Sequence, residues 1–142
     1  MSYSISATAA PKKEGVVNLN ETFTPFGISK NVQQALPSPA HLFLGSLAAC
    51  ILKNIHRFSI MMNFDYQEAT IIVSSNYAQK PSRLENINYK VEIVSNEDRI
   101  NTLLLQRNLS KFGTIYNMIA SSTEVSGTVT HKRTQIGLHK ES

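Results

Sequence analysis

Residues 38–52 read SPAHLFLGSLAACIL, and this stretch constrains the fold most strongly. Serine caps free N–H groups at the start of a helix, and proline suits the first helical position because it has no N–H to leave unpaired. Ser38-Pro39 therefore predicts the start of a helix that runs to about Met62. From Leu42 to Leu52 this helix is apolar almost all round, and a helix without a polar face must be covered on every side. The pattern favours a central helix wrapped by sheets, from one chain or from two.

Strand patterns lie on both sides of this helix. Short, imperfectly alternating runs in residues 1–35 favour two or three antiparallel strands. Downstream, Ala69 to Val73 is rich in β-branched residues, which favour strands. Ile87 to Ile93 alternates apolar and polar residues, which is typical of a strand with one buried face. Val125 to His131 is the last predicted strand.

Two shorter helices are predicted between the last two strands. Ser95 to Asp98 resembles a helix cap followed by acidic residues, which the helix dipole favours in a first turn. Apolar residues then follow at helical spacing from Ile100 to about Phe112, and a short helix from Ile115 to Ala120 comes next. This order of elements predicts an α+β fold with antiparallel sheets around a long central helix. It is not a regular βαβ alternation, which argues against a parallel dinucleotide-binding sheet.

Length and composition narrow the class of protein. A chain of 142 residues predicts a single domain over residues 1–142, and 42% hydrophobic residues are enough to build a core. The net charge is +4, but the basic runs Lys12-Lys13 and His131-Lys132-Arg133 do not alternate with aromatic residues, so a nucleic-acid partner is not expected. The longest apolar run is far shorter than the ~20 residues of a membrane span. With no signal-peptide pattern at the N-terminus, we expect a cytoplasmic protein without a membrane anchor.

Cys50 is the single cysteine, so a disulfide within the chain is impossible. Lys53, Asn54 and Arg57 follow at helical spacing and share the face of Cys50. Two cations and an amide would favour the thiolate, which is the nucleophilic form of cysteine. Two plainer interpretations stay open: Cys50 as a buried, inert thiol, and Lys53 with Arg57 as an ordinary solvent-exposed stripe.

The sequence predicts neither a metal ion nor a cofactor. Its four histidines form no i,i+4 pair and no cluster with cysteine. The chain also has no phosphate loop and no glycine-rich nucleotide fingerprint. His41, in the first turn of the long helix, is either a site residue or a partly buried side chain with satisfied hydrogen bonds.

Two segments carry a resemblance to a known family. The segment Pro39 to Cys50 resembles the Pro-x-x-Leu…Ala-Ala-Cys helix of the OsmC/Ohr family, the osmotically inducible protein C and organic hydroperoxide resistance proteins. Lys111 to Ile115 resembles the Lys-Tyr-Cys-Pro-Val segment of that family, and the match covers roughly residues 36–132. The resemblance implies an OsmC-like α+β fold and an intertwined homodimer with sites at the subunit interface.

The resemblance also implies a chemistry, of which this chain keeps a part. In family enzymes the helix cysteine attacks an organic hydroperoxide and becomes a sulfenic acid, a second cysteine resolves it, and an external dithiol reduces the disulfide. Cys50 matches the attacking cysteine, whereas Gly113 stands at the resolving position and Ala40 at the position of an assisting glutamate. No arginine precedes Arg57 to match the upstream arginine of the family, and Lys30 is a candidate replacement.

Two hypotheses about function follow. In the first, Cys50 is the catalytic residue of a one-cysteine peroxidase that acts on organic hydroperoxides and is reduced by an external thiol. In the second, the chain is a non-catalytic OsmC-like dimer that binds a small hydrophobic ligand in an apolar pocket. Each candidate lining residue of that pocket could equally be an ordinary residue of the hydrophobic core. They are His41, Phe43, Leu47, Phe58 and Tyr116.

Overall fold

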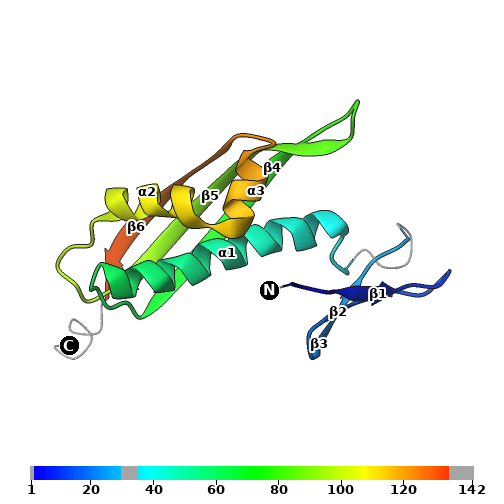
Figure 1. The fold of residues 1–142 in the computed structure, drawn as a ribbon, viewed down its shortest axis with the longest axis horizontal. Coiled ribbons are helices and arrows are strands. Elements are labelled where there is room, and N and C mark those ends of the chain that lie inside the picture. The colour runs from blue at the N-terminus through cyan, green and yellow to red at the C-terminus, as the bar shows by residue number, and fades with distance from the viewer. Residues whose placement is uncertain (1, 30–34, 135–142) are drawn as a thin grey trace. The chain divides into compact units, whose positions relative to one another are not determined.

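The computed structural model describes residues 2–29 and 35–134, which form an α+β structure (Figure 1). The chain divides into two compact units, Met1–Phe43 and Leu44–Ser142. Each unit is described by itself, and the single domain expected from the chain length stays a prediction.

The first unit is a three-stranded antiparallel sheet. Strand β2 (Gly15–Leu19) lies in the middle and pairs with β1 (Ser6–Thr8) and β3 (Thr22–Phe26). This confirms the antiparallel strands predicted for residues 1–35. Large apolar side chains stay exposed here, among them Tyr3 at 90% and Phe23 at 71%. The intertwined homodimer, in which a second chain would cover such side chains, stays a prediction.

Helix α1 (Pro39–Met61) starts where the sequence predicts. The backbone N–H of Ser38 donates to Nδ1 of His41 at 3.0 Å, and the N–H of His41 donates back to Ser38 Oγ at 3.4 Å. This is a reciprocal capping box in which histidine takes the place usually held by glutamate or glutamine. The helix buries a stripe at helical spacing, formed by Leu47, Ile51, Ile55 and Phe58. Cover on the remaining faces of α1 by a second chain stays a prediction.

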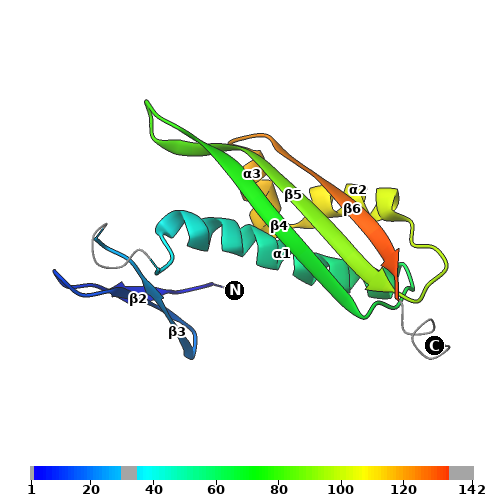
Figure 2. The same cartoon turned by 180° about the vertical axis from the view of Figure 1, so that it is seen from behind.

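The second unit packs helices on one face of a three-stranded sheet. The sheet has the order β4 (Glu68–Ala78), β5 (Arg83–Ser95), β6 (Val125–Arg133). Helices α1, α2 (Thr102–Phe112) and α3 (Thr114–Ala120) lie on the same side of it in Figure 1, and the reverse view in Figure 2 shows the sheet in front of them. The alternation predicted for residues 87–93 is confirmed, because the core contains Ile87, Tyr89, Val91 and Ile93.

The prediction of purely antiparallel sheets is wrong for one pair of strands. β4 and β5 are antiparallel, but β5 and β6 run parallel, in register from Ile87 with Val125 to Ser95 with Arg133. Residues 96–124 connect β5 to β6 and carry α2 and α3. A connection of this length that contains helices returns the chain to the same end of the sheet, which is what a parallel pair requires.

The predicted start of α2 is also wrong. The side chain of Asn101 caps the helix by accepting a hydrogen bond from the N–H of Leu104 at 3.0 Å. Ser95 is instead the last residue of β5, and its hydroxyl donates to the backbone carbonyl of Asp65. Ser95 therefore belongs to the sheet and does not cap α2, although the local sequence predicts a cap at this serine.

Tyr89 is the largest fully buried side chain of the core, with 1% of its surface exposed. It lies opposite Gly127 across the parallel pair, and a Cβ added to Gly127 would come within 2.3 Å of two ring carbons of Tyr89. On another side the ring meets Tyr116 edge-on, with 6.4 Å between ring centroids. A strand glycine that admits an aromatic ring in this way is fixed by packing.

The burial of Tyr89 predicts a pH-dependent stability. Burial, together with the neighbouring Tyr116 phenol, raises the pKa of Tyr89 to about 12. The stabilisation is fully present below about pH 10, the ordinary pKa of tyrosine, and is lost as the pH rises to about 12, because the unfolded chain ionises first. We expect the free energy of unfolding to fall by on the order of 2–3 kcal/mol more for the wild type than for Tyr89→Phe across this interval. Urea denaturation at a series of pH values measures this difference, and parallel curves would contradict it.

Candidate functional site

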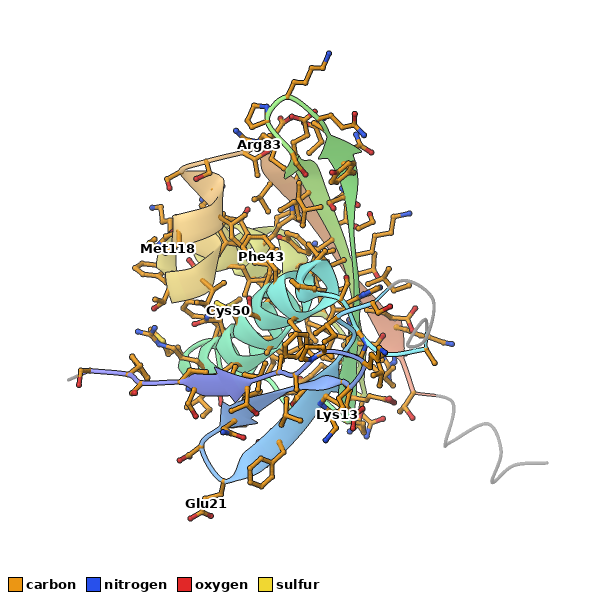
Figure 3. All side chains as sticks on the ribbon, turned by 90° about the vertical axis from the view of Figure 1, so that its right-hand side faces the viewer. Lys13, Glu21, Phe43, Cys50, Arg83 and Met118 are labelled. Atoms are coloured by element: carbon orange, nitrogen blue, oxygen red, sulfur yellow. The ribbon has the colours of Figure 1, made fainter. Side chains whose placement is uncertain are left out.

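The candidate site is built around Cys50, which is half-buried on α1. Its side of the helix is turned toward α3 in Figure 3. One helical turn further on, Nδ2 of Asn54 lies 2.9 Å from the backbone oxygen of Cys50 and 3.7 Å from its Sγ, and it donates to both. A side-chain amide carries two hydrogens, so one is available for each acceptor. The hydrogen bond to the backbone oxygen of Cys50 thus holds the amide in a position from which it reaches the sulfur.

Gly113 brings a distant part of the chain to the same sulfur. It is buried between α2 and α3, and a Cβ added to it would lie 3.2 Å from Cys50 Sγ and 3.5 Å from Asn54 Nδ2. The two segments that carry the family resemblance therefore meet at Cys50, although Gly113 lies 63 positions after Cys50 in sequence.

Tyr116 supports the Gly113 segment from within the core. Its ring is buried, and its hydroxyl donates to the backbone oxygen of Val125, on β6, at 3.4 Å. Burial raises the pKa of Tyr116, so its phenol keeps the donated proton to a higher pH than an exposed tyrosine does. Tyr116 therefore ties the start of α3, next to Gly113, to the sheet.

The three thiolate-assisting candidates occupy different surroundings. Asn54 contacts the sulfur as described. Lys53 and Arg57 are exposed, and the guanidinium carbon of Arg57 lies 5.6 Å from the centroid of the Phe58 ring, in a cation–π contact. The roles of Lys53 and Arg57 at the thiol stay predictions, and Lys30 lies outside the described residues.

The five pocket candidates also divide between two environments. Leu47, Phe58 and Tyr116 belong to the buried core. Phe43 is 44% exposed, and His41 is exposed and takes part in the capping box of α1. A ligand pocket lined by all five stays a prediction.

Two features are absent from residues 2–29 and 35–134. Within these ranges the structure places no group of three or more histidine, cysteine, aspartate or glutamate residues that could hold a metal ion. None of the helices in this part of the chain combines the length and apolar character that a membrane crossing requires.

Comparison with known proteins identifies the family. The sequence model of the OsmC-like protein family matches residues 32–127, which is more than half of the chain. The chain belongs to the OsmC-like protein family. This confirms the resemblance drawn from the Pro39–Cys50 and Lys111–Ile115 segments. No match was found among curated protein sequences.

Solved structures show the same fold. An OsmC-like protein from Mycoplasma pneumoniae is 18% identical, with a TM-score of 0.81 over 92% of this chain and 97% of that one. An OsmC-like protein of unknown function from Vibrio cholerae is 14% identical, with a TM-score of 0.78 over 91% and 99% of the two chains. An organic hydroperoxide resistance protein from Elizabethkingia anophelis is 17% identical, with a TM-score of 0.70 over 94% and 99%. At these identities the comparison establishes the OsmC-like fold.

Proposed function

We propose that this protein reduces organic hydroperoxides through Cys50, as a one-cysteine peroxidase that depends on an external thiol. The observation that carries the proposal is the half-buried sulfur of Cys50 with the amide of Asn54 directed at it at 3.7 Å. A hydrogen-bond donor aimed at a sulfur stabilises negative charge on it, and the thiolate is the form that attacks peroxides. The substrate class is taken from the relatives named as organic hydroperoxide resistance proteins.

The first step oxidises the protein. The Cys50 thiolate attacks one peroxide oxygen, so that an S–O bond forms and the O–O bond breaks. The leaving alkoxide takes a proton and departs as an alcohol, while Cys50 becomes a sulfenic acid. The peroxide is thereby reduced by two electrons, and the sulfur is oxidised by two.

The second step restores the thiol with two equivalents of an external thiol. The first thiolate attacks the sulfenic sulfur, an S–S bond forms, and the S–O bond breaks to release water after proton transfer. A second thiolate then attacks the sulfur of the bound thiol and releases the Cys50 thiolate together with a small-molecule disulfide. An external donor is required because Cys50 is the single cysteine of the chain.

Turnover of cumene hydroperoxide with excess glutathione tests the proposal. We expect the wild type to consume the peroxide, and Cys50→Ser to lower the rate by more than about 100-fold because serine is not oxidised to an equivalent intermediate. Ala49→Ser is the matched control, since it adds the same hydroxyl group at the neighbouring exposed position of α1 and leaves the sulfur in place. This control is expected to retain the wild-type rate.

Two results would contradict the proposal. One is the absence of a sulfenic acid on the wild-type protein, measured with a trapping reagent after cumene hydroperoxide is added. The other is a peroxide consumption that Cys50→Ser leaves unchanged.

A further inference from the structure

The three helices beside the sheet carry positive charge and no acidic residue. Helices α1, α2 and α3 contain four lysine and arginine residues but no aspartate or glutamate, although the chain has 10 acidic residues. The four cations are Lys53 and Arg57 on α1, with Arg107 and Lys111 on α2, and all are exposed. Across the described part of the chain, none of the four is paired with a carboxylate. The chain therefore leaves the charge of these helices without a partner.

The acidic residues that precede α2 have partners elsewhere. Asp98 pairs with Arg133, with 2.6 Å between Oδ1 and Nη1. Glu97 accepts a hydrogen bond from the backbone N–H of Asp65 at 2.9 Å. Neither carboxylate is therefore committed to the cations of the helices.

Contacts between α1 and α2 bring cations from both helices to one surface. The rings of Phe58 and Phe112 have centroids 5.9 Å apart, and Nδ2 of Asn108 donates to Sδ of Met62 at 3.9 Å. The two helices therefore run side by side in opposite directions, on the same side of the sheet in Figure 1. Arg57 directly precedes Phe58 and Lys111 directly precedes Phe112, so a cation from each helix borders this contact.

Large apolar side chains are exposed beside these cations. Residues three, four or seven positions apart share one face of a helix. Ile60, which is exposed, therefore shares a face with Lys53 and Arg57 on α1. Leu103, with 76% of its surface exposed, shares a face with Arg107 and Lys111 on α2. We call the surface formed by these six residues the basic face.

We propose that the basic face binds the surface of a membrane that contains anionic phospholipids. Lysine and arginine are attracted by the negative potential of such a surface, and each increases binding roughly fivefold. Exposed leucine and isoleucine side chains enter the boundary between headgroups and acyl chains, where they leave water. A face of this kind lies on the bilayer and needs no segment that crosses it. The inference does not depend on the proposed peroxidase reaction.

Two other occupants fit the basic face less well. A nucleic acid would match the cations with its phosphates, but it would place Ile60 and Leu103 against a charged backbone. A second copy docked through the same face would bring cations against cations, because a two-fold interface uses the same patch on both subunits. An anionic bilayer satisfies both the charges and the apolar side chains.

Flotation of the full chain with lipid vesicles tests the proposal. We expect vesicles of phosphatidylcholine and phosphatidylglycerol in about equal parts to bind the protein at least about tenfold more tightly than pure phosphatidylcholine does. Added salt should weaken this binding, because it screens the attraction between exposed charges. No flotation with the mixed vesicles, or equal binding to both kinds of vesicle, would overturn the proposal.

A charge-matched pair of variants locates the binding surface. Arg107→Gln combined with Lys111→Gln is expected to weaken binding to the mixed vesicles at least about tenfold. Lys90→Gln combined with Lys132→Gln removes the same charge from the other side of the sheet, where Lys90 alternates with the buried Tyr89 and Val91 and is exposed, as is Lys132. This control should weaken binding less than about threefold, because its charges lie farther from the lipid. Equal losses in the two double variants would overturn the proposal.

A second pair of variants tests the apolar contact. Leu103→Ser is expected to weaken vesicle binding about fivefold or more, because an inserted side chain is lost. Ile72→Ser is the matched control, since Ile72 is 71% exposed and lies on β4 between Ile71 and Val73, which pack against the core. This control should leave vesicle binding unchanged. Equal effects of the two serine variants would contradict insertion of the basic face.

Two further results would assign the basic face to another occupant and overturn the proposal. One is a DNA duplex that binds more tightly than the mixed vesicles at the same salt concentration and loses affinity in the Arg107→Gln, Lys111→Gln variant. The other is a change in the oligomeric state of this variant in the absence of lipid, measured by sedimentation. Loss of peroxide consumption affects only the proposed function, because Arg107 and Lys111 take no part in that reaction.

Discussion

Mild oxidation of a Gly113→Cys variant is expected to join residues 50 and 113 in an internal disulfide. A Cβ on residue 113 would lie 3.2 Å from Cys50 Sγ, which is close to the separation of about 3 Å found within disulfides. The two residues are therefore close enough for the bond to form, once a small shift relieves the 2.9 Å contact of that Cβ with Tyr116 Cβ. The variant would supply the resolving cysteine that the family resemblance places at this position and that the chain lacks.

The disulfide is expected to raise stability strongly. It would close a loop spanning 63 residues, and restriction of the unfolded chain by such a loop corresponds to about 4 kcal/mol in the chain-entropy description. We expect the oxidised form to exceed the reduced form of the same variant by about 3–4 kcal/mol in the free energy of unfolding. Urea denaturation of both forms measures this. Both forms carry the same crowding against Tyr116, so its free-energy cost cancels when the two forms of one variant are compared.

Thiol titration provides the control for this variant. One equivalent of oxidant should remove both free thiols of Gly113→Cys without linking one chain to another. The double variant Cys50→Ser with Gly113→Cys should keep its single thiol unpaired. Two thiols that persist after oxidation, or disulfides found only between chains, would show that residues 50 and 113 are not adjacent.

Gly127→Ala is expected to destabilise the protein by about 2–3 kcal/mol, because it forces a methyl group into a filled core. The added Cβ would lie 2.3 Å from two ring carbons of Tyr89 and 2.5 Å from a third, the one that joins the ring to its Cβ. These atoms are close to the backbone of a side chain that is 1% exposed, so the ring cannot swing aside. The midpoint of urea denaturation measures the effect.

Gly45→Ala gives the opposite sign and serves as the control. Gly45 is exposed within α1, and a Cβ there meets nothing within 4 Å. Alanine in place of glycine inside a helix is expected to stabilise by about 0.5–1 kcal/mol. Combining Gly127→Ala with Tyr89→Leu should recover part of the loss, since a smaller side chain relieves the clash. Equal effects of the two alanine substitutions would contradict the packing argument.

Local sequence patterns predicted the secondary structure where the cause is itself local. The Ser38-Pro39 start of α1 depends on groups within one turn, and the face of β5 depends on alternation along one strand. The parallel pairing of β5 with β6 could not be read in this way, because alternation identifies the buried face of a strand and says nothing of its partner's direction. The cap assigned to Ser95 failed for the same reason, since β5 extends to Ser95 through pairing with Arg133.

The candidate site also contains one contact that local sequence predicts and one that depends on the tertiary fold. The proximity of Asn54 to Cys50 follows from a separation of four residues on one helix, which places the two side chains on one face. The proximity of Gly113 depends on how α2, α3 and β6 return to the sheet, and no periodicity in the chain encodes it. Only the resemblance of residues 111–115 to a family segment pointed to that position.

The parallel pairing of β5 with β6 also orders the assembly of the chain. β4 and β5 are neighbours in sequence and can pair across a short turn, whereas β6 reaches β5 only after residues 96–124 have folded back. Contacts between distant segments form late because the loop must be closed first. Gly113 lies within this returning segment, so a newly synthesised chain carries the Cys50 thiol without its neighbour until β6 is in place. The surroundings of Cys50 described above are therefore complete only after this returning segment has folded.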